Sequence, residues 1–162
     1  QVGALAAFAK TQGRSLQHVK PHGALYNMAV KDAALAAAVA RAVHDIDSNL
    51  ILFGLAGSQL IVQGKKMGLQ KASEVFADRT YQPDGSLTPR SRADAMVTDE
   101  NIAISRVLRM ITEGVVRAQN GEDIPVRADT VCVHGDGAKA LAFACKIHSV
   151  LSEQGVTVTS FR

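Results

Sequence analysis

The chain of 162 residues contains no tryptophan, and aromatic residues make up only 4% of it. Without large rings the core must be built mainly from Ala, Val, Leu and Ile, and this length is enough for one domain with a sizeable core. No apolar run is as long as a membrane-spanning helix requires, and no signal peptide opens the chain. We therefore predict a single cytoplasmic domain over residues 1–162, with no membrane partner.

Cysteine and clustered positive charge are also scarce. Cys132 and Cys145 lie in apolar surroundings and lack a metal-binding or redox spacing, so we expect buried free thiols in a reducing compartment. Eighteen basic against fifteen acidic side chains give a net charge of +3. Because no run of Lys or Arg concentrates this excess, the charge does not favour binding to nucleic acid.

Short apolar runs alternate with helical patterns along the chain. The runs that indicate strands are residues 16–20, 50–54, 71–77, 130–133 and 156–161. Helical patterns begin at Val2, Asp32, Ser58, Thr98 and Asp136. Residues 115–127, with Asn120-Gly121 at their centre, predict a type I′ hairpin. The alternation is typical of an α/β fold with a parallel sheet, either open and doubly wound or part of a barrel.

Polar and titratable residues collect in the loops that follow the predicted strands. Parallel α/β folds place their sites at these carboxyl ends. After the first strand, Lys20 can hold a carboxylate or phosphate, and His22 can transfer protons or act as a ligand. Tyr26 and Asn27 add a phenol and an amide for substrate binding. The alternative is structural: Lys20 pairs with a carboxylate and His22 bonds to the backbone.

The third strand leads into a long connection, residues 78–97, of the kind that is usually functional or disordered. Asp78 is in phase with Glu74 and Phe76, so it belongs to the same face of the strand. A buried carboxylate needs a partner, and the candidates are Arg79, Arg90 and Arg92. Asp78 is a candidate catalytic group, and Arg79 and Arg90 are candidate substrate-binding groups. A structural salt-bridge network explains the same residues.

His134 and Asp136 follow the strand at residues 130–133. Asp136 is expected to begin the next helix as its N-cap, and it is also a candidate substrate-binding residue. A His-x-Asp pair alone is a weak metal signal, and no clear third ligand is visible, so no tightly bound metal is predicted. The chain has no P-loop motif, although the helix start at Gly57-Ser58 has free N–H groups that can hold an anion.

Three stretches resemble the LamB/YcsF family in the right order. They are residues 18–27 (HVKPHGALYN), residues 74–81 (EVFADRTY) with 84–85 and 89–91, and residues 124–136 (IPVRADTVCVHGD). The family usually has Gly-Ala where this chain has Asp94-Ala95. The motifs with which family members begin are not in this sequence, so we expect it to correspond to the C-terminal two-thirds of a member, with the N-terminal part missing.

The resemblance implies a seven-stranded (β/α) barrel of the glycoside hydrolase and deacetylase type. It implies the A component of a three-component, ATP-dependent 5-oxoprolinase, with the B and C components as partners and ATP, with Mg, as co-substrate. In that role Lys20 and the candidate substrate-binding arginines, Arg79 and Arg90, hold carboxylate or phosphate groups, and His22 or His134 moves protons with Asp78. Two alternatives are a metal-dependent amidohydrolase that uses His134 and Asp136, and a non-catalytic subunit that docks a partner. A homo-oligomer is also compatible with the sequence.

Overall fold

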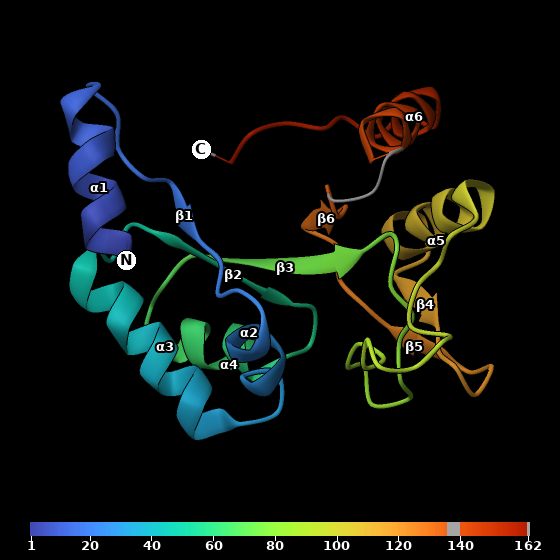
Figure 1. Cartoon of the computed structure of the whole chain (residues 1–162), viewed down its shortest axis with the longest axis horizontal. Coiled ribbons are helices and arrows are strands. Elements are labelled where there is room, and N and C mark those ends of the chain that lie inside the picture. The colour runs from blue at the N-terminus through green and yellow to red at the C-terminus, as the bar shows by residue number, and fades with distance from the viewer. Residues whose placement is uncertain (136–139, 162) are drawn as a thin grey trace. The chain divides into compact units, whose positions relative to one another are not determined.

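The computed structural model describes residues 1–135 and 140–161 (Figure 1). Contacts divide the chain into two compact units, Gln1–Ser73 and Glu74–Arg162. The strand β3, Lys71–Phe76, begins in the first unit and ends in the second. The hydrogen-bonded strand order is β1-β2-β3-β6.

The first unit alternates helices with two parallel strands. Its elements are α1 (Val2–Thr11), β1 (His18–Val19), α2 (Ala24–Met28), α3 (Ala33–Ile46), β2 (Ile51–Leu55) and α4 (Gln59–Lys66). In the β1–β2 pair, His18 lies opposite Ile51 and Val19 opposite Leu52. The chain segments that follow β1 and β2 therefore leave from the same edge of the sheet.

The second unit contains the end of β3 and one further parallel strand. Its other elements are α5 (Glu100–Thr112), β4 (Val115–Arg117), β5 (Asp123–Pro125), β6 (Thr130–Cys132) and α6 (Ala140–Glu153). In the β3–β6 pair, Glu74 lies opposite Thr130 and Phe76 opposite Cys132. The strands β4 and β5 form a separate antiparallel hairpin. An α/β fold with a parallel sheet is thus confirmed.

Small residues bring α4 close to β2 in the first unit. A Cβ atom on Gly54 would lie 2.8 Å from the Cβ of Leu60, and one on Gly64 would lie 3.0 Å from Cδ2 of Leu52. The buried cluster around Leu52 comprises Ala40, Val43, Leu50, Leu52 and Leu69. Aliphatic side chains and close backbone approach fill this core, as the scarcity of aromatic residues requires.

The first four predicted strands are confirmed, with shorter or shifted ends, but the strand predicted at 156–161 is wrong. Among the described residues this segment forms no ladder, and Val156 N donates to Leu151 O at 2.9 Å as the chain leaves α6. An alternating pattern becomes a strand only where a neighbouring strand supplies hydrogen-bond partners.

Three expectations about helices and cysteines also need correction. The prediction missed α2, because five residues are too few to show helical periodicity. The sequence of α3 is apolar nearly all round, which favours a helix covered on most sides, but α3 buries only Ala36, Ala40 and Val43. Cys132 on β6 is half-buried rather than buried. Cys145 is exposed, because α6 turns Phe143, Ile147 and Leu151 inward instead.

The hairpin is present, but its turn is not type I′. Type I′ requires positive φ at both central residues, whereas Gly121 has φ 85° and no described residue other than glycine has positive φ. Gly121 N donates to Ala118 O at 3.0 Å, and Ala118 N donates to Glu122 O at 2.8 Å. This pattern is typical of a type I turn followed by a glycine bulge.

The N-cap of α5 is Asp99 rather than the predicted Thr98. The Asp99 carboxylate accepts hydrogen bonds from Asn101 N at 2.8 Å and Ile102 N at 3.1 Å. Threonine and aspartate both cap helices, so the sequence alone does not decide between Thr98 and Asp99 as the N-cap. The Asp99 carboxylate also complements the positive end of the helix dipole.

Changing Asp99 to alanine is therefore expected to lower the free energy of unfolding by about 1 kcal/mol. The matched control is Thr98→Ala, which removes the neighbouring cap candidate and should change stability by less than about 0.5 kcal/mol. Urea denaturation of both variants measures the difference. Equal losses in the two variants would contradict the assignment of the cap.

In residues 1–135 and 140–161, no helix has both the length and the apolar character needed to cross a membrane.

Candidate functional site

Asp78 and His134 lie side by side at the carboxyl ends of β3 and β6. Phe76 and Cys132 are opposite one another in the parallel register, and each titratable residue comes two positions later. His134 Nδ1 lies 2.7 Å from Oδ2 and 3.0 Å from Oδ1 of Asp78. The backbone N–H of His134 also donates to Asp78 Oδ2 at 3.3 Å. The parallel pairing of two strands therefore creates this contact.

This arrangement selects one tautomer of the His134 ring. A carboxylate only accepts hydrogen bonds, so Nδ1 carries the proton and donates it to Asp78. The Asp78 and His134 side chains are 12% and 25% exposed, so the pair is largely shielded while the ring keeps some access. The ring of Phe76 stacks on His134 with centroids 5.8 Å apart. Nε2 is left as the nitrogen that can accept and return a proton.

The expected arginine partner of Asp78 is wrong, because its carboxylate bonds to His134 instead. Arg92 forms an ion pair with Asp94 at 2.7 Å, two residues along the exposed loop. Arg90 is exposed. The family resemblance joins His134 to Asp78 for proton transfer, and the register of β3 with β6 brings the two side chains together although they are 56 residues apart in the chain.

Arg79 is buried and its guanidinium contacts the backbone of the long loop. Its side chain donates from Nε to Ala95 O at 3.3 Å and from Nη2 to Thr88 O at 2.5 Å. Burial, followed by the positive charge of Arg90, lowers the pKa of Arg79 from its ordinary value. The predicted contact of Arg79 with substrate stays a prediction, and these bonds show that two carbonyl groups already engage it.

The connection at 78–97 is packed against the strand end rather than extended away from it. Tyr81 is fully buried, and its hydroxyl accepts a hydrogen bond from Phe76 N at 2.9 Å. Burial raises the pKa of Tyr81 well above its ordinary value. In this environment Tyr81 contributes packing, and its hydroxyl is engaged by the backbone. Thr88, also fully buried, donates from its backbone N to Thr80 O at 3.0 Å.

The first unit carries the other predicted residues at the end of β1. Lys20 Nζ lies 5.6 Å from the ring centroid of Tyr26, a cation–π distance. Tyr26 is buried on α2, whereas His22 and Asn27 are exposed. Asn27 Nδ2 donates to Gly23 O at 3.2 Å, within its own helical turn. The sequence placed Tyr26 and Asn27 in a loop, but a short helix presents them.

Ser58 combines burial with an unsatisfied hydroxyl. It is 2% exposed at the N-cap of α4, yet its side chain makes no capping bond, and Oγ has no partner among the described residues. The ideal Cβ position of Gly54 lies 3.4 Å from this oxygen. Anion binding at Gly57-Ser58 stays a prediction.

The described residues contain no group of three or more His, Cys, Asp or Glu side chains arranged to hold a metal ion. Asp136, predicted both as an N-cap and as a substrate-binding residue, lies outside the described residues.

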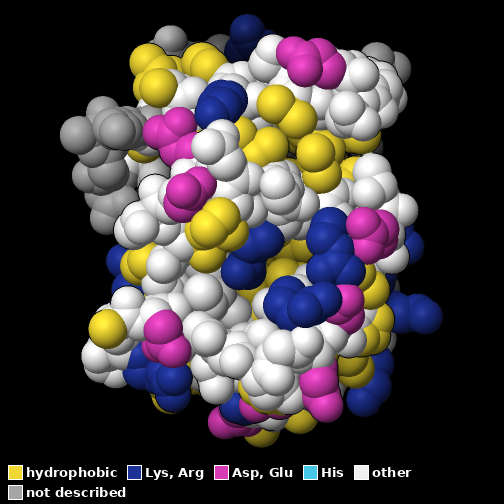
Figure 2. All heavy atoms as spheres, turned by 90° about the vertical axis from the view of Figure 1, so that its right-hand side faces the viewer, with side chains coloured by type: hydrophobic (Ala, Val, Ile, Leu, Met, Phe, Trp, Pro, Cys, Tyr) yellow, Lys and Arg dark blue, Asp and Glu magenta, His cyan; other side chains and the backbone are white. Residues whose placement is uncertain are grey.

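Positive side chains on the face with α5 and the hairpin are interleaved with acidic ones (Figure 2). Arg109 pairs with Glu113 at 2.9 Å and with Asp123 at 2.8 Å, and Arg117 pairs with Asp123 at 2.6 Å. The two arginines hold the pKa of Asp123 below its usual range. These contacts join α5 to the hairpin.

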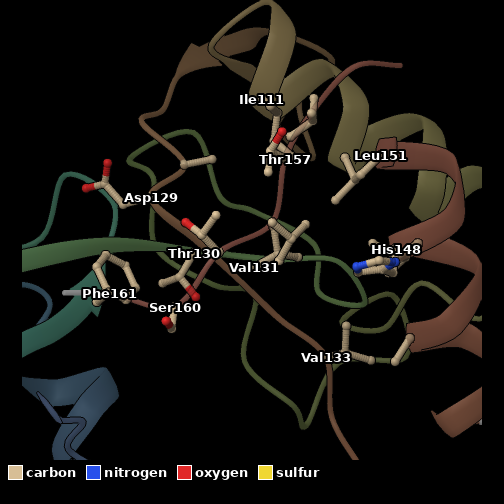
Figure 3. A pocket seen from close by; sticks show the side chains of 16 residues that line it. Ile111, Asp129, Thr130, Val131, Val133, His148, Leu151, Thr157, Ser160 and Phe161 are labelled. Carbon is tan, nitrogen blue, oxygen red and sulfur yellow. The ribbon is translucent and has the colours of Figure 1, made fainter. Parts of the chain in front are cut away.

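A pocket of about 450 Å³ lies elsewhere in the second unit, between β6, α6 and the segment 156–161. Figure 3 shows Val131, Leu151 and Thr157 around it. Its lining is mainly apolar, with His148 and Asp129 among the polar side chains. None of the predicted site residues that the structure describes lines this pocket. We therefore centre the candidate site of this unit on the carboxyl ends of β3 and β6.

Comparison with known proteins identifies the family of this chain. The model of the LamB/YcsF family matches residues 1–162. The chain belongs to the LamB/YcsF family.

Relatives of this family member include proteins named as the A component of 5-oxoprolinase. One from Tolumonas auensis is 61% identical over 158 residues, which are 98% of this chain and 63% of that protein. One from Bacillus subtilis is 55% identical over 160 residues, covering 99% and 62%. A crystal structure of a lactam utilization protein from Thermus thermophilus matches with a TM-score of 0.88 and 42% identity, covering 99% and 64%. The chain thus spans somewhat less than two thirds of the length of these relatives.

Proposed function

We propose that this family member acts as the A component of an ATP-dependent 5-oxoprolinase, which opens 5-oxo-L-proline to L-glutamate by hydrolysis. The observation that carries the proposal is the Asp78–His134 pair at the strand ends, in a chain similar to proteins named as that component. The similarity to a lactam utilization protein supports the same substrate class, because 5-oxoproline is a lactam. The B and C components are the proposed partners, in the cytoplasm.

The chemistry requires activation of a poor electrophile. Transfer of a phosphoryl group from ATP, with Mg, to the lactam oxygen supplies a leaving group and makes the carbonyl carbon of the ring reactive toward water. In this proposal His134 Nε2 takes the proton of the attacking water and supplies a proton to the ring nitrogen as the C–N bond breaks. The product of that step is γ-glutamyl phosphate, and a second water then displaces inorganic phosphate to give glutamate. Asp78 keeps Nδ1 protonated and stabilises the imidazolium that forms between these transfers.

Substrate binding is assigned to the remaining polar residues at the strand ends. The cation of Lys20 is suited to the carboxylate of 5-oxoproline or to phosphate, and the exposed Arg90 offers a second cation. His22 is the other proposed proton-transfer group. Tyr26, Asn27 and Asp136 are proposed to contact substrate. For the whole protein we propose the seven-stranded barrel of the glycoside hydrolase and deacetylase type.

A metal-dependent amidohydrolase is the second candidate, and one observation favours it. A histidine that donates one ring N–H to a carboxylate commonly binds a metal through its other nitrogen, and His134 has this relation to Asp78. In that case His134 Nε2 and Asp136 would be ligands, and the ion would activate water. Stoichiometric metal in the purified full-length protein, together with hydrolysis of N-acyl substrates without ATP, would support this candidate.

The proposed function is tested by measuring glutamate formation from 5-oxoproline and ATP. The B and C components are assayed with and without the full-length protein. Turnover should depend on its presence, and Lys20→Ala and His22→Ala should each lower it by about 10²-fold or more. Lys10→Ala, which changes an exposed lysine on α1, is the matched control and should leave turnover unchanged. Turnover without this protein would refute the proposal.

A further inference from the structure

Arg79 occupies an unusual place directly after the candidate catalytic Asp78. It is 4% exposed, although its side chain carries a full charge. Its guanidinium reaches two carbonyl groups, those of Thr88 and Ala95, seven residues apart in the long loop. Burying an arginine costs free energy unless its N–H groups are bonded. The loop backbone, and not an acidic side chain, provides these bonds.

The backbone around Asp78 and Arg79 is held at several further points. Val97 N donates to Asp78 O at 2.9 Å, and Arg79 forms an antiparallel bridge with Met96. From α5, Arg106 Nη2 donates to Arg79 O at 2.8 Å. The start, middle and end of the loop therefore all converge on the two residues that carry the carboxylate and the buried guanidinium.

The shape of the arginine side chain is important for this arrangement. A planar guanidinium presents several N–H groups in a rigid fork and can bridge two carbonyls at once, whereas the ammonium of lysine is a single compact group. Losing the fork would leave the buried carbonyl of Thr88 without its Arg79 donor, while the carbonyl of Ala95 would keep the backbone N–H of Thr80 at 3.1 Å. The loop would then hold the Asp78 backbone less firmly, and the 2.7 Å contact of its carboxylate with His134 Nδ1 depends on that backbone.

We propose that Arg79 is a positioning residue for the Asp78–His134 pair: it ties the 78–97 loop to the strand end and so keeps the carboxylate on His134 Nδ1. This assignment replaces substrate contact as the role of Arg79, and it rests on the proposed function for its kinetic consequence. The geometric part concerns the His134 tautomer and does not depend on the identity of the substrate.

The test compares Arg79→Gln, Arg79→Lys and Arg92→Gln in the full-length protein with the B and C components. Arg79→Gln should lower kcat for 5-oxoproline by about 10²-fold, the effect of a small misplacement of a catalytic group. KM should change by less than about threefold, because substrate contacts remain. Arg79→Lys should recover part of kcat. Arg92→Gln changes an exposed arginine of the same loop, paired with Asp94, and should match the wild type.

Nitrogen-15 NMR of the His134 ring measures which ring nitrogen carries the proton. A general loss of structure would not change this tautomer selectively. The wild type and Arg92→Gln should show the Nδ1–H tautomer, and Arg79→Gln should show a mixture of both tautomers. A raised KM with unchanged kcat would overturn the proposal and make Arg79 a substrate ligand. An unchanged tautomer in folded Arg79→Gln would overturn it as well. If Arg79→Gln does not fold, Arg79→Lys decides in its place: it should show a smaller share of the second tautomer than full loss of the fork, and a kcat and tautomer both equal to those of the wild type would overturn the proposal. If the wild type forms no glutamate, the proposed function fails, while the tautomer comparison still decides the role of Arg79.

Discussion

Replacing Asp78 by asparagine is expected to lower kcat for ring opening by about 10²- to 10⁴-fold. Asparagine has nearly the same shape, so packing at the strand end is preserved. Its amide presents an N–H₂ group as well as an oxygen, and it carries no charge to stabilise a His134 imidazolium. The Nδ1 proton is then no longer fixed by two carboxylate oxygens at 2.7 and 3.0 Å. The fraction of molecules with a basic Nε2 falls for this reason.

Asp94→Asn is the matched control for this change. It makes the same carboxylate-to-amide substitution in the same loop, where the Asp94 side chain is 44% exposed and pairs with Arg92. We expect kcat within about twofold of the wild type for this variant. Steady-state turnover of 5-oxoproline with ATP and the partner components measures both. Wild-type kcat in Asp78→Asn would remove the Asp78–His134 pair from the mechanism.

Leu52→Ala is expected to produce the largest loss of stability, about 2–5 kcal/mol in the free energy of unfolding. Leu52 is fully buried on β2 and belongs to the cluster that α3 and β2 share. The close approach of Gly64 to its Cδ2 atom shows that the surrounding backbone already packs against this side chain. A rigid wall of that kind relaxes poorly, so most of the removed volume remains as a cavity.

Leu5→Ala is the control, since Leu5 on α1 is 59% exposed. The same substitution there should change the free energy of unfolding by less than about 0.5 kcal/mol. Urea denaturation of the full-length protein, followed by circular dichroism, compares the two variants with the wild type. Similar losses in both would show that burial in the β2 cluster does not determine the stability of this unit.

Local patterns predicted most of the elements that carry the site. Short runs indicated β2, β3 and β6 at nearly their observed positions. The clearest is β2, which is apolar and buried along its whole length, as expected for an inner strand of a parallel sheet. The polar residues after them indicated a strand-end site. The helix α2 and the irregular segment 156–161 could not be predicted. The helix is too short to show a period, and the segment lacks a partner strand among the described residues.

The sequence by itself determined the class of fold, the family and the candidate residues, because strand periodicity and specific motifs are local properties of the chain. Only the tertiary structure decided which residues meet. Asp78 met His134, 56 positions away, rather than an arginine of its own loop, and Arg79 turned to backbone carbonyls. The register between β3 and β6 determines the first contact, and the path of the folded loop determines the second. Neither depends on spacing along the chain.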